Sequence, residues 1–292
     1  MKKKLTWITE LALFFAVSFP LSLLPLALAR KAGRGLGLGY YHWNKKRRRI
    51  AVENVNRAIG KGALPTGLSP EEIVKESDKN MGCSLLELVK IYYGRGGGVF
   101  RSISIEGFEN FEKAKARGKG VMFITGHCGN WELLGLTLSE KTRTGVVGRP
   151  LNNPYLNTIL ERLREKYGNY AIHKKGALRG LLRAFKEGGN IAILMDQAVI
   201  PDEGVVINFL GSPAWTIKTP ATMAKRTSAA LLPAFIKRQG SGHRVIIHPE
   251  VQPTGDERED IQRLTNYIED YVRGNPTEWL WIHRRWKRTE GM

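Results

Sequence analysis

The sequence predicts an α/β fold in which a central, mostly parallel sheet is flanked by helices, with an apolar membrane-anchoring helix at the N-terminus. From about residue 100 onward, short apolar runs suited to strands alternate with segments of helical periodicity. This order is typical of parallel sheets covered by helices. An uncharged apolar segment occupies residues 11–29, and the 292-residue chain is long enough for one large domain with an appendage.

Residues 1–30 are expected to anchor the protein in a membrane. At about 1.5 Å per residue, a helix over residues 11–29 would cross most of a bilayer core. Pro20 and Pro25 interrupt this segment. A kinked span or a partly inserted anchor is therefore as compatible with the sequence as a straight helix.

A cleaved signal peptide is the alternative for this segment. Residues 2–4 are lysines and residues 27–29 resemble a cleavage site. However, Arg30 and the basic cluster at residues 45–49 place dense positive charge just beyond the apolar run, which opposes translocation. We therefore expect the segment to be retained, with the body of the protein on the cytoplasmic side.

Residues 31–68 are predicted to form a basic and aromatic connector at the membrane interface. Residues 33–44 are rich in glycine and aromatic side chains, and they lack the strand, helix and distant acid of a dinucleotide-binding fingerprint. The basic cluster at residues 45–49 follows beside Trp43. Such a combination suits anionic headgroups, and a solvated charge run is the alternative.

Residues 69–292 are predicted to form the main domain. Ser69 is a candidate N-cap, Pro70 suits a first helical turn and Glu72 can reach back to the cap. This helix is expected to continue to Tyr93 with a break near Gly82. The elements expected after it are a strand at 100–105, a helix at 109–116, a strand from 121, a helix at 131–138, a strand at 145–148, helices at 154–167 and 177–186, and strands at 191–195, 205–209, 231–236 and 245–248.

The composition points to anionic partners. Lys and Arg number 46 against 27 Asp and Glu, which gives a net charge of +19. Nucleic acid, a phospholipid surface, a phosphorylated substrate and an acidic carrier protein all fit such a charge. The two cysteines, Cys83 and Cys128, form no disulfide framework and have no metal-ligand spacing with histidine. We therefore expect a reducing compartment and no structural zinc.

A histidine and a carboxylate flank a predicted strand-to-helix turn, where α/β sheets place reactive groups. The apolar run ends at Gly126, the helix begins near Trp131, and His127 and Glu132 lie around this turn. An imidazole can take a proton from an alcohol, while a carboxylate fixes its tautomer and stabilises the imidazolium. The alternative is that His127 caps the helix and Glu132 is a solvated acid. Cys128 is expected to be structural, because adjacent side chains rarely face one another.

Two more predicted strands end in polar residues. Arg149 and Asn153 follow one strand and precede a helix, an arrangement that suits an anionic or carbonyl group. Asp196 and Gln197 end a fully apolar strand at the edge where open α/β sheets bind ligands. A simple turn-forming role is the alternative for Asp196.

Two later segments are expected to cover the cleft. Residues 209–216 would form a loop over it and then start a helix. Near the C-terminus, Trp279, His283 and Trp286 fall near one face of a helix surrounded by cations. Such a strip suits a membrane interface or the covering of a deep apolar site. Ordinary core packing of the tryptophans is the alternative.

Taken together, these segments resemble the late acyltransferases of lipid A biosynthesis, the lauroyl/myristoyl transferase family within the glycerolipid acyltransferase superfamily. The resemblance covers the N-terminal anchor and most of residues 69–287. Its most specific pieces are residues 126–132, which look like the family's His-x4-acid block, Arg149-Pro150 with Asn153-Pro154, Met195-Asp196-Gln197, residues 209–216 and residues 281–287. A lone His-x4-Glu spacing is weak evidence, whereas five blocks in order are strong evidence.

The resemblance implies a membrane-associated O-acyltransferase that moves a fatty acyl chain from acyl-acyl carrier protein to a hydroxyl of a lipid A precursor. The acceptor would be a phosphorylated glycolipid, and the acidic donor protein would suit the basic body. The implied location is the bacterial inner membrane, with the catalytic domain on the cytoplasmic side and an anionic membrane surface as a further partner. No metal or other cofactor is implied.

The resemblance also implies roles for individual residues. His127 would be the general base and Glu132 its orienting partner. Because no suitable serine or cysteine nucleophile adjoins His127, we expect direct transfer, with the oxyanion stabilised by backbone N–H groups or by a cation. The implied substrate-binding residues are Arg164, which looks like the family's essential arginine, Asp196, which matches its acidic block, and Arg149, Asn153 and Gln197.

Two other functions compete with this interpretation. A related glycolipid acyltransferase that acts on phosphatidylinositol mannosides with acyl-CoA would use the same His–Glu pair. A membrane-associated nucleic-acid-binding protein would account for the charge of +19. The second is disfavoured because the basic residues are dispersed through a domain with an enzyme-like cleft, so nucleic acid is not an expected partner.

Overall fold

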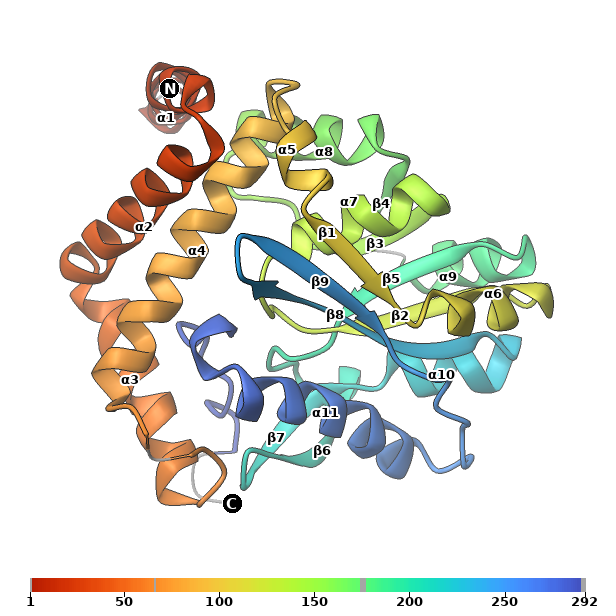
Figure 1. Cartoon of the computed structure of the whole chain (residues 1–292). Helices are drawn as coiled ribbons and strands as arrows, with labels where there is room; N and C mark the ends of the chain where they lie inside the picture. The colour runs from red at the N-terminus through yellow and green to blue at the C-terminus, as the bar shows by residue number, and fades with distance from the viewer. Residues whose placement is uncertain (1, 66, 174–176, 290–292) are drawn as a thin grey trace.

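A seven-stranded sheet forms the centre of the molecule in the computed structural model, which describes residues 2–65, 67–173 and 177–289 (Figure 1). The strand order is β1-β9-β8-β2-β5-β3-β4, and neighbouring strands pair in parallel except for β8 and β9. The expected mostly parallel sheet is confirmed. The strands are β1 (Ile103–Glu106), β2 (Val121–Thr125), β3 (Thr144–Gly148), β4 (Asn169–His173), β5 (Asn190–Leu194), β8 (Ala230–Gln239) and β9 (Gly242–Ile247).

Helices cover both faces of this sheet because its central strand is apolar on both sides. In β2, Val121 and Phe123 join one hydrophobic core, while Met122 and Ile124 join the other, as the alternation of side chains along a strand requires. The first core is packed by α6 (Phe108–Ala116), α7 (Trp131–Lys141) and α8 (Pro154–Lys166), and the second by α9 (Ala177–Lys186), α10 (Thr219–Thr227) and α11 (Glu257–Gly274).

The N-terminal third of the chain is helical and lies along one side of the sheet domain (Figure 1). The capping box at Ser69 and Glu72 is confirmed. Pro20 lies inside the first helix, and the second helix begins just after Pro25. The helices are α1 (Lys2–Leu23), α2 (Leu26–Trp43), α3 (Lys45–Gly60), α4 (Pro70–Tyr92) and the short α5 (Gly97–Phe100).

Glycines let α2 pack directly on α4, and the predicted connector at residues 31–68 consists mostly of two helices, the end of α2 and α3. A Cβ atom on Gly82 would lie 2.1 Å from the carbonyl oxygen of Gly33, and one on Gly37 would lie 2.1 Å from that of Asp78. Only glycine permits this approach. The predicted break near Gly82 was wrong, because α4 is continuous and Gly82 is a point of helix contact.

Helix α1 is the candidate membrane anchor. Residues Lys3–Leu23 are long and apolar enough to cross a membrane, and only 11% of the most apolar window is buried. Large apolar side chains such as Leu13 and Val17 are 59% and 51% exposed. A helix of this composition, uncovered by the protein, fits insertion into lipid.

Two expectations at the C-terminal half were wrong, and one open alternative is decided. Residues 209–216 do not form a loop before a helix, because β6 (Gly204–Phe209) and β7 (Ser212–Ile217) make a separate antiparallel hairpin. After the short 3-10 turn Pro276–Glu278, the tail contains no helix as far as residue 289, where the described part of the chain ends. Trp279, Trp281 and Trp286 are at most 2% exposed. They pack in the core rather than at a membrane interface.

A buried carboxylate ties the helical N-terminal part to the sheet. The Glu87 side chain on α4 is fully buried and accepts hydrogen bonds from Arg30, Arg238, His243 and Asn130 at 2.7, 2.9, 2.9 and 3.0 Å. Burial would raise the pKa of Glu87, but these partners hold it well below its ordinary value. One side chain therefore joins α2, α4, α7, β8 and β9.

Replacing Glu87 by glutamine is expected to destabilise the protein by about 3–5 kcal/mol, because it leaves buried cations without their counter-ion. Urea unfolding in detergent measures the change. The matched control is Glu76→Gln on the same helix, which breaks a partly exposed pair with Arg34 and should cost no more than about 1 kcal/mol. Equal losses in the two variants would contradict a structural role for the Glu87 network.

Candidate active site

His127 and Asp196 meet at the carboxyl edge of the sheet. Strands β2 and β5 pair in parallel with Thr125 opposite Leu194, so the residues that follow the two strands reach the same edge. The Nδ1 atom of His127 lies 2.8 Å from Oδ1 of Asp196. The backbone N–H of His127 also donates to Oδ2, over 2.8 Å. The two residues form one hydrogen-bonded unit.

Hydrogen bonds to both carboxylate oxygens hold the Asp196 side chain in place, and the carboxylate is ionised. Its side chain is 2% exposed, and the indole Nε1 of Trp279 donates to Oδ2 over 2.8 Å. Burial would raise the pKa of Asp196, but the charge of His127 and the hydrogen bonds hold it well below the usual range. An ionised Asp196 accepts a hydrogen bond from the Nδ1–H group of His127, which selects the tautomer with a basic Nε2.

The imidazole is partly exposed and oriented by further contacts. Burial alone would lower the pKa of His127, but the charge and hydrogen bond of Asp196 raise it above its ordinary value of 6.5. The amide nitrogen of Gln197 lies 3.2 Å from Nε2 and 3.5 Å from Nδ1. The amide therefore lies within hydrogen-bonding distance of Nε2, the ring nitrogen that does not contact Asp196. Trp131 packs against the ring edge to face, with centroids 5.0 Å apart.

Glu132 does not occupy the position expected of it. Its carboxylate accepts hydrogen bonds from Nε and Nη2 of Arg164 on α8, over 3.0 and 2.5 Å. Glu132 lies in the first turn of α7 and pairs with α8. Asp196, which follows β5, is the residue that bonds the imidazole. The residue that orients His127 by hydrogen bonding is therefore Asp196, which corrects the role expected of Glu132. The charge of Glu132 still contributes to the raised pKa of His127.

The other two predicted substrate-binding residues follow the end of β3 and begin α8. Arg149 is exposed at the carboxyl end of β3. Asn153 is 5% exposed and caps α8, accepting from the backbone N–H groups of Tyr155 and Leu156. Its amide nitrogen donates to α1, to the Glu10 carboxylate over 2.8 Å. Asn153 thus has a structural partner at each end of its amide, and its role in substrate binding stays a prediction.

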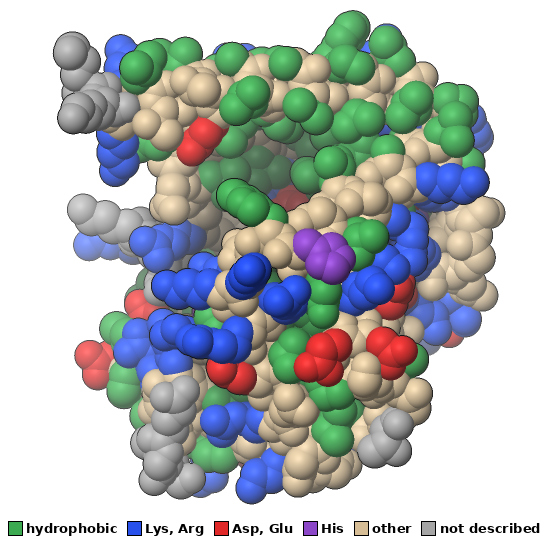
Figure 2. Space-filling view, turned by 90° about the vertical axis from the view of Figure 1, so that its left-hand side faces the viewer, with side chains coloured by type: hydrophobic (Ala, Val, Ile, Leu, Met, Phe, Trp, Pro, Cys, Tyr) green, Lys and Arg blue, Asp and Glu red, His purple; other side chains and the backbone are tan. Residues whose placement is uncertain are grey.

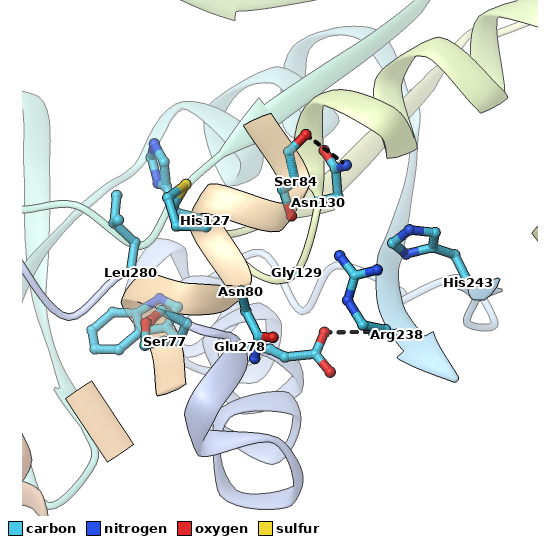
Figure 3. A pocket seen from close by; sticks show the side chains of 12 residues that line it. Ser77, Asn80, Ser84, His127, Gly129, Asn130, Arg238, His243, Glu278 and Leu280 are labelled. Carbon is cyan, nitrogen blue, oxygen red and sulfur yellow. Dashed lines mark hydrogen bonds between the residues drawn. The ribbon is translucent and has the colours of Figure 1, made fainter. Parts of the chain in front are cut away.

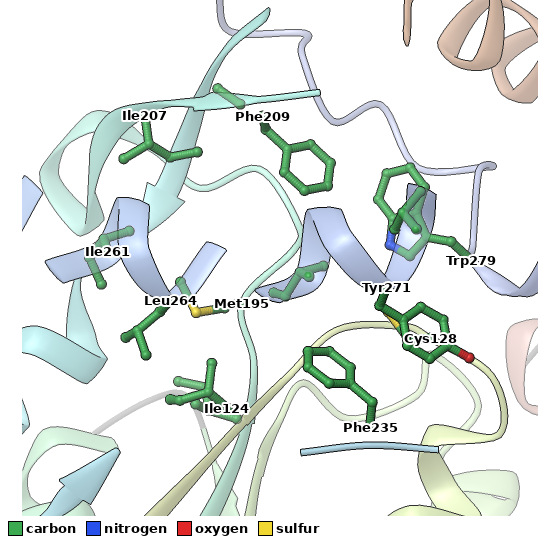
Figure 4. Packing of buried hydrophobic residues seen from close by; sticks show 14 of the residues in the cluster. Ile124, Cys128, Met195, Ile207, Phe209, Phe235, Ile261, Leu264, Tyr271 and Trp279 are labelled. Atoms are coloured by element: carbon green, nitrogen blue, oxygen red, sulfur yellow. The ribbon is translucent and has the colours of Figure 1, made fainter. Parts of the chain in front are cut away.

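The turn that carries His127 is tightly packed. Gly129 has a φ of 55°, and a Cβ atom there would lie 2.1 Å from the carbonyl oxygen of Ile236. Cys128 is 1% exposed, and burial raises the pKa of its thiol well above the ordinary value. Figure 4 shows it among the buried aromatic rings of Phe235, Tyr271 and Trp279. A buried, protonated thiol fits the structural role expected for Cys128.

A small polar pocket of about 10 Å³ adjoins His127. Figure 3 shows His127 at one side of it and Arg238 and His243 at the other. The amide oxygen of Asn130 caps α7, and its nitrogen donates to Glu87 over 3.0 Å. The buried network around Glu87 therefore supports the start of the helix that carries Glu132.

An apolar groove of about 360 Å³ continues from this pocket. Figure 2 shows a hollow lined by hydrophobic side chains on the side of the molecule that carries the N-terminal helices. The groove and the polar pocket share Met81, Ser84, Gly129 and Asn130 in their linings. The remaining lining comes from α1 (Phe14), α4 (Leu85, Leu88, Val89, Tyr92), the loop before α8 and α8 itself (Leu151, Leu156, Ile159, Leu160, Leu163), and the start of α7 (Trp131, Glu132).

No pattern in the sequence indicates Trp279 as a hydrogen-bond donor to Asp196 or Glu87 as a support of the turn that carries His127. Trp279 is 83 residues from Asp196 in the sequence, and Glu87 is 43 residues from Asn130, the residue of this turn to which it bonds. Within the described part of the chain, no group of three or more His, Cys, Asp or Glu side chains could hold a metal ion.

Comparison with known proteins identifies the family. A model of the bacterial lipid A biosynthesis acyltransferases matches residues 2–288. The chain is 26% identical to a lipid A biosynthesis palmitoleoyltransferase of Escherichia coli (strain K12), over 83% of this chain and 79% of the relative. It is 24% identical to the lauroyltransferase of the same organism, over 99% and 93% of the two chains. It is also 24% identical to a phosphatidylinositol mannoside acyltransferase of Mycobacterium tuberculosis (strain ATCC 25618 / H37Rv), over 80% and 75%. With nearly its whole length matched by one family model, the chain belongs to the bacterial lipid A biosynthesis acyltransferases.

Proposed function

We propose that the protein transfers a fatty acyl chain from acyl-acyl carrier protein to a hydroxyl of a lipid A precursor, with His127 as general base. The observation that carries this proposal is the His127–Asp196 pair beside a groove with an almost wholly apolar lining. A basic imidazole suits an acceptor hydroxyl, and an apolar groove suits an acyl chain. The family and its curated relatives support lipid A as the acceptor.

The proposed reaction needs only groups that this chain supplies. With a proton on Nδ1 shared with Asp196, Nε2 of His127 takes the proton of the acceptor hydroxyl as its oxygen attacks the thioester carbonyl carbon. The tetrahedral intermediate collapses, the carbon–sulfur bond breaks, and the imidazolium returns its proton to the departing thiolate. Asp196 stabilises the imidazolium in between. The products are the ester and the free thiol of the donor.

Arg164 is the proposed stabiliser of the oxyanion. Its guanidinium bonds Glu132 at the start of α7, and Glu132 lines the groove. A guanidinium held by two parallel hydrogen bonds is fixed in direction. Glu132 would thus orient Arg164, and the N-terminal turn of α7 would add backbone N–H groups.

Replacing Arg164 by lysine is expected to lower kcat about 10²- to 10³-fold with little change in KM, because the charge remains but its fixed position is lost. Steady-state kinetics with saturating acceptor measure the two constants. Arg162→Lys is the matched control, since Arg162 is exposed on the same helix. A loss confined to KM would instead assign Arg164 to ground-state binding of the acceptor.

The proposed location is the cytoplasmic face of the bacterial inner membrane. The exposed apolar side of α1 would enter the bilayer. Figure 2 shows Lys and Arg side chains gathered below the groove, and the basic residues 45–49 begin α3. These charges suit the anionic headgroups of that leaflet. The phosphorylated acceptor would reach the groove from the same surface, where the exposed Arg149 is a further proposed contact.

Crossing two donors with two acceptors tests the proposal. The purified full-length protein in detergent is given labelled acyl-acyl carrier protein or acyl-CoA, with a tetra-acylated lipid A precursor or a phosphatidylinositol mannoside. We expect transfer from acyl-acyl carrier protein to the lipid A precursor. Transfer only to the mannoside would favour the second activity, which the mycobacterial relatives suggest. A labelled acyl-enzyme trapped by rapid quenching would overturn direct transfer.

A further inference from the structure

Helix α1 is attached to the catalytic domain near both of its ends. Near its N-terminal end, the amide nitrogen of Asn153 donates to the backbone oxygen of Trp7 over 3.0 Å and to the Glu10 carboxylate over 2.8 Å. Because Asn153 is also the N-cap of α8, this contact holds α1 against α8. A helix that served only as a lipid anchor would need no such buried contact.

The other end of α1 is attached to α4. The Lys90 ammonium is buried and donates to the backbone oxygens of Ser22 and Leu24, over 2.8 and 2.6 Å. It satisfies carbonyls that the end of a helix leaves without partners. The hydroxyls of Ser18 and Tyr93 lie 2.9 Å apart. The helix therefore bridges α8 and α4, the two helices that form the walls of the apolar groove.

Between these attachments, Phe14 enters the groove while its neighbours face outward. Phe14 lines the groove, whereas Leu13 and Phe15 are 59% and 38% exposed. The ring of Phe14 packs edge to face against Tyr92, with centroids 6.4 Å apart. One side of α1 therefore belongs to the groove, and the opposite side is available to lipid.

The Phe14–Tyr92 contact lies at the end of the groove remote from His127. Met81 and Ser84 line both the groove and the polar pocket of His127, whereas Tyr92 lines the groove alone. Met81 and Tyr92 are eleven residues apart on the continuous helix α4, a rise of about 16 Å. An acyl chain whose thioester lies beside His127 would thus run along α4 toward the two rings.

We infer that Phe14 and Tyr92 form the stop that limits the length of the transferred acyl chain, and that α1 carries this stop in addition to acting as an anchor. The inference rests on the proposed function, because it takes the fatty acyl chain of the donor as the occupant of the groove. Asn153 and Lys90 are positioning residues that hold α1, and with it Phe14, at the required distance from His127.

Chain-length profiles of two neighbouring variants test the inference. Wild type, Phe14→Ala and Phe15→Ala are each given a series of acyl-acyl carrier proteins that differ by two carbons. A site that rejects one extra methylene lowers kcat/KM for the longer substrate about 10- to 200-fold. In wild type, kcat/KM for the donor two carbons longer than the optimum should therefore be lower by at least that factor. Phe14→Ala should lose most of this rejection and shift its optimum to longer chains, and Phe14→Trp should shift it to shorter ones. Phe15→Ala removes the same kind of side chain from the neighbouring position. The Phe15 ring contacts that of Phe14, with centroids 5.5 Å apart, but it does not line the groove, so this variant should keep the wild-type profile.

The outcomes separate this inference from the proposed function. If wild type transfers acyl groups and Phe14→Ala keeps its chain-length optimum, the stop is overturned while the function stands. If Phe14→Ala and Phe15→Ala lose vesicle binding and activity equally without a shift in optimum, α1 is an anchor only. Binding of free fatty acids of graded length is measured in parallel, because it does not depend on transfer. A shift in its optimum in Phe14→Ala would support the stop even if no donor and acceptor pair reacted.

Discussion

Replacing His127 by alanine is expected to lower acyl transfer about 10²- to 10⁴-fold, which is the contribution of a positioned general base. The imidazole is the partly exposed member of the pair, since the side chain of Asp196 is only 2% exposed. The other histidine described beside the polar pocket, His243, also pairs with a buried carboxylate, that of Glu87, but it is only 3% exposed. The rate is measured with labelled donor at saturating concentrations of both substrates.

A matched histidine variant separates loss of the base from loss of structure. His248 is partly buried and packs against Phe235 and Tyr267, with ring centroids 5.9 and 5.0 Å apart. His248→Ala should therefore cost stability but leave the rate per folded molecule within a few-fold of wild type. Transfer by His127→Ala at a rate similar to that of His248→Ala would exclude His127 as the base.

Most strands of the sheet, and the edge that carries His127 and Asp196, could be predicted because their signals are local, whereas the edge strand β4 was not predicted. The apolar runs of β2 and β5 and the polar residues that follow them are visible in the sequence, and parallel strands end at one edge. The pairing of those strands is not local. The assignment of an orienting role to Glu132 followed its closeness in sequence to His127, whereas the hydrogen-bond partner is Asp196, 69 residues further on.

Helix packing explains why the N-terminal part was harder to predict. Glycine has a low helical propensity, so residues 33–44 indicate a connector when considered alone. In the structure, Gly33 and Gly37 face α4, and the close backbone contact that they permit favours the helix. Likewise, the tryptophans of the tail have helical spacing, but their burial beneath the β6–β7 hairpin depends on contacts that the sequence does not indicate.

Replacing Asp196 by asparagine is expected to reduce transfer about 10³- to 10⁴-fold and to change its dependence on pH. An amide in place of the carboxylate can donate to Nδ1 and so favour the tautomer that lacks a basic Nε2. In wild type, the rate should rise as His127 loses its proton, and this rise should lie above pH 6.5 because Asp196 raises the pKa of His127. Without that negative charge, the burial of the imidazole dominates and the rise in the residual rate should move to lower pH.

The same pair links stability to pH. Since the pKa of His127 is raised on folding, its interaction with Asp196 stabilises the fold fully below pH 6.5 and this contribution is lost as the pH rises through the raised value. Asp196→Asn should abolish that pH dependence. Asp260→Asn is the matched control, because Asp260 is 3% exposed and accepts from the backbone N–H and hydroxyl of Thr254, remote from His127 in α11. This variant should lose stability but keep the wild-type pH profile of the rate. An unchanged profile in Asp196→Asn would contradict the role of Asp196, since a carboxylate that merely supported the fold would leave the titration of the base where it was.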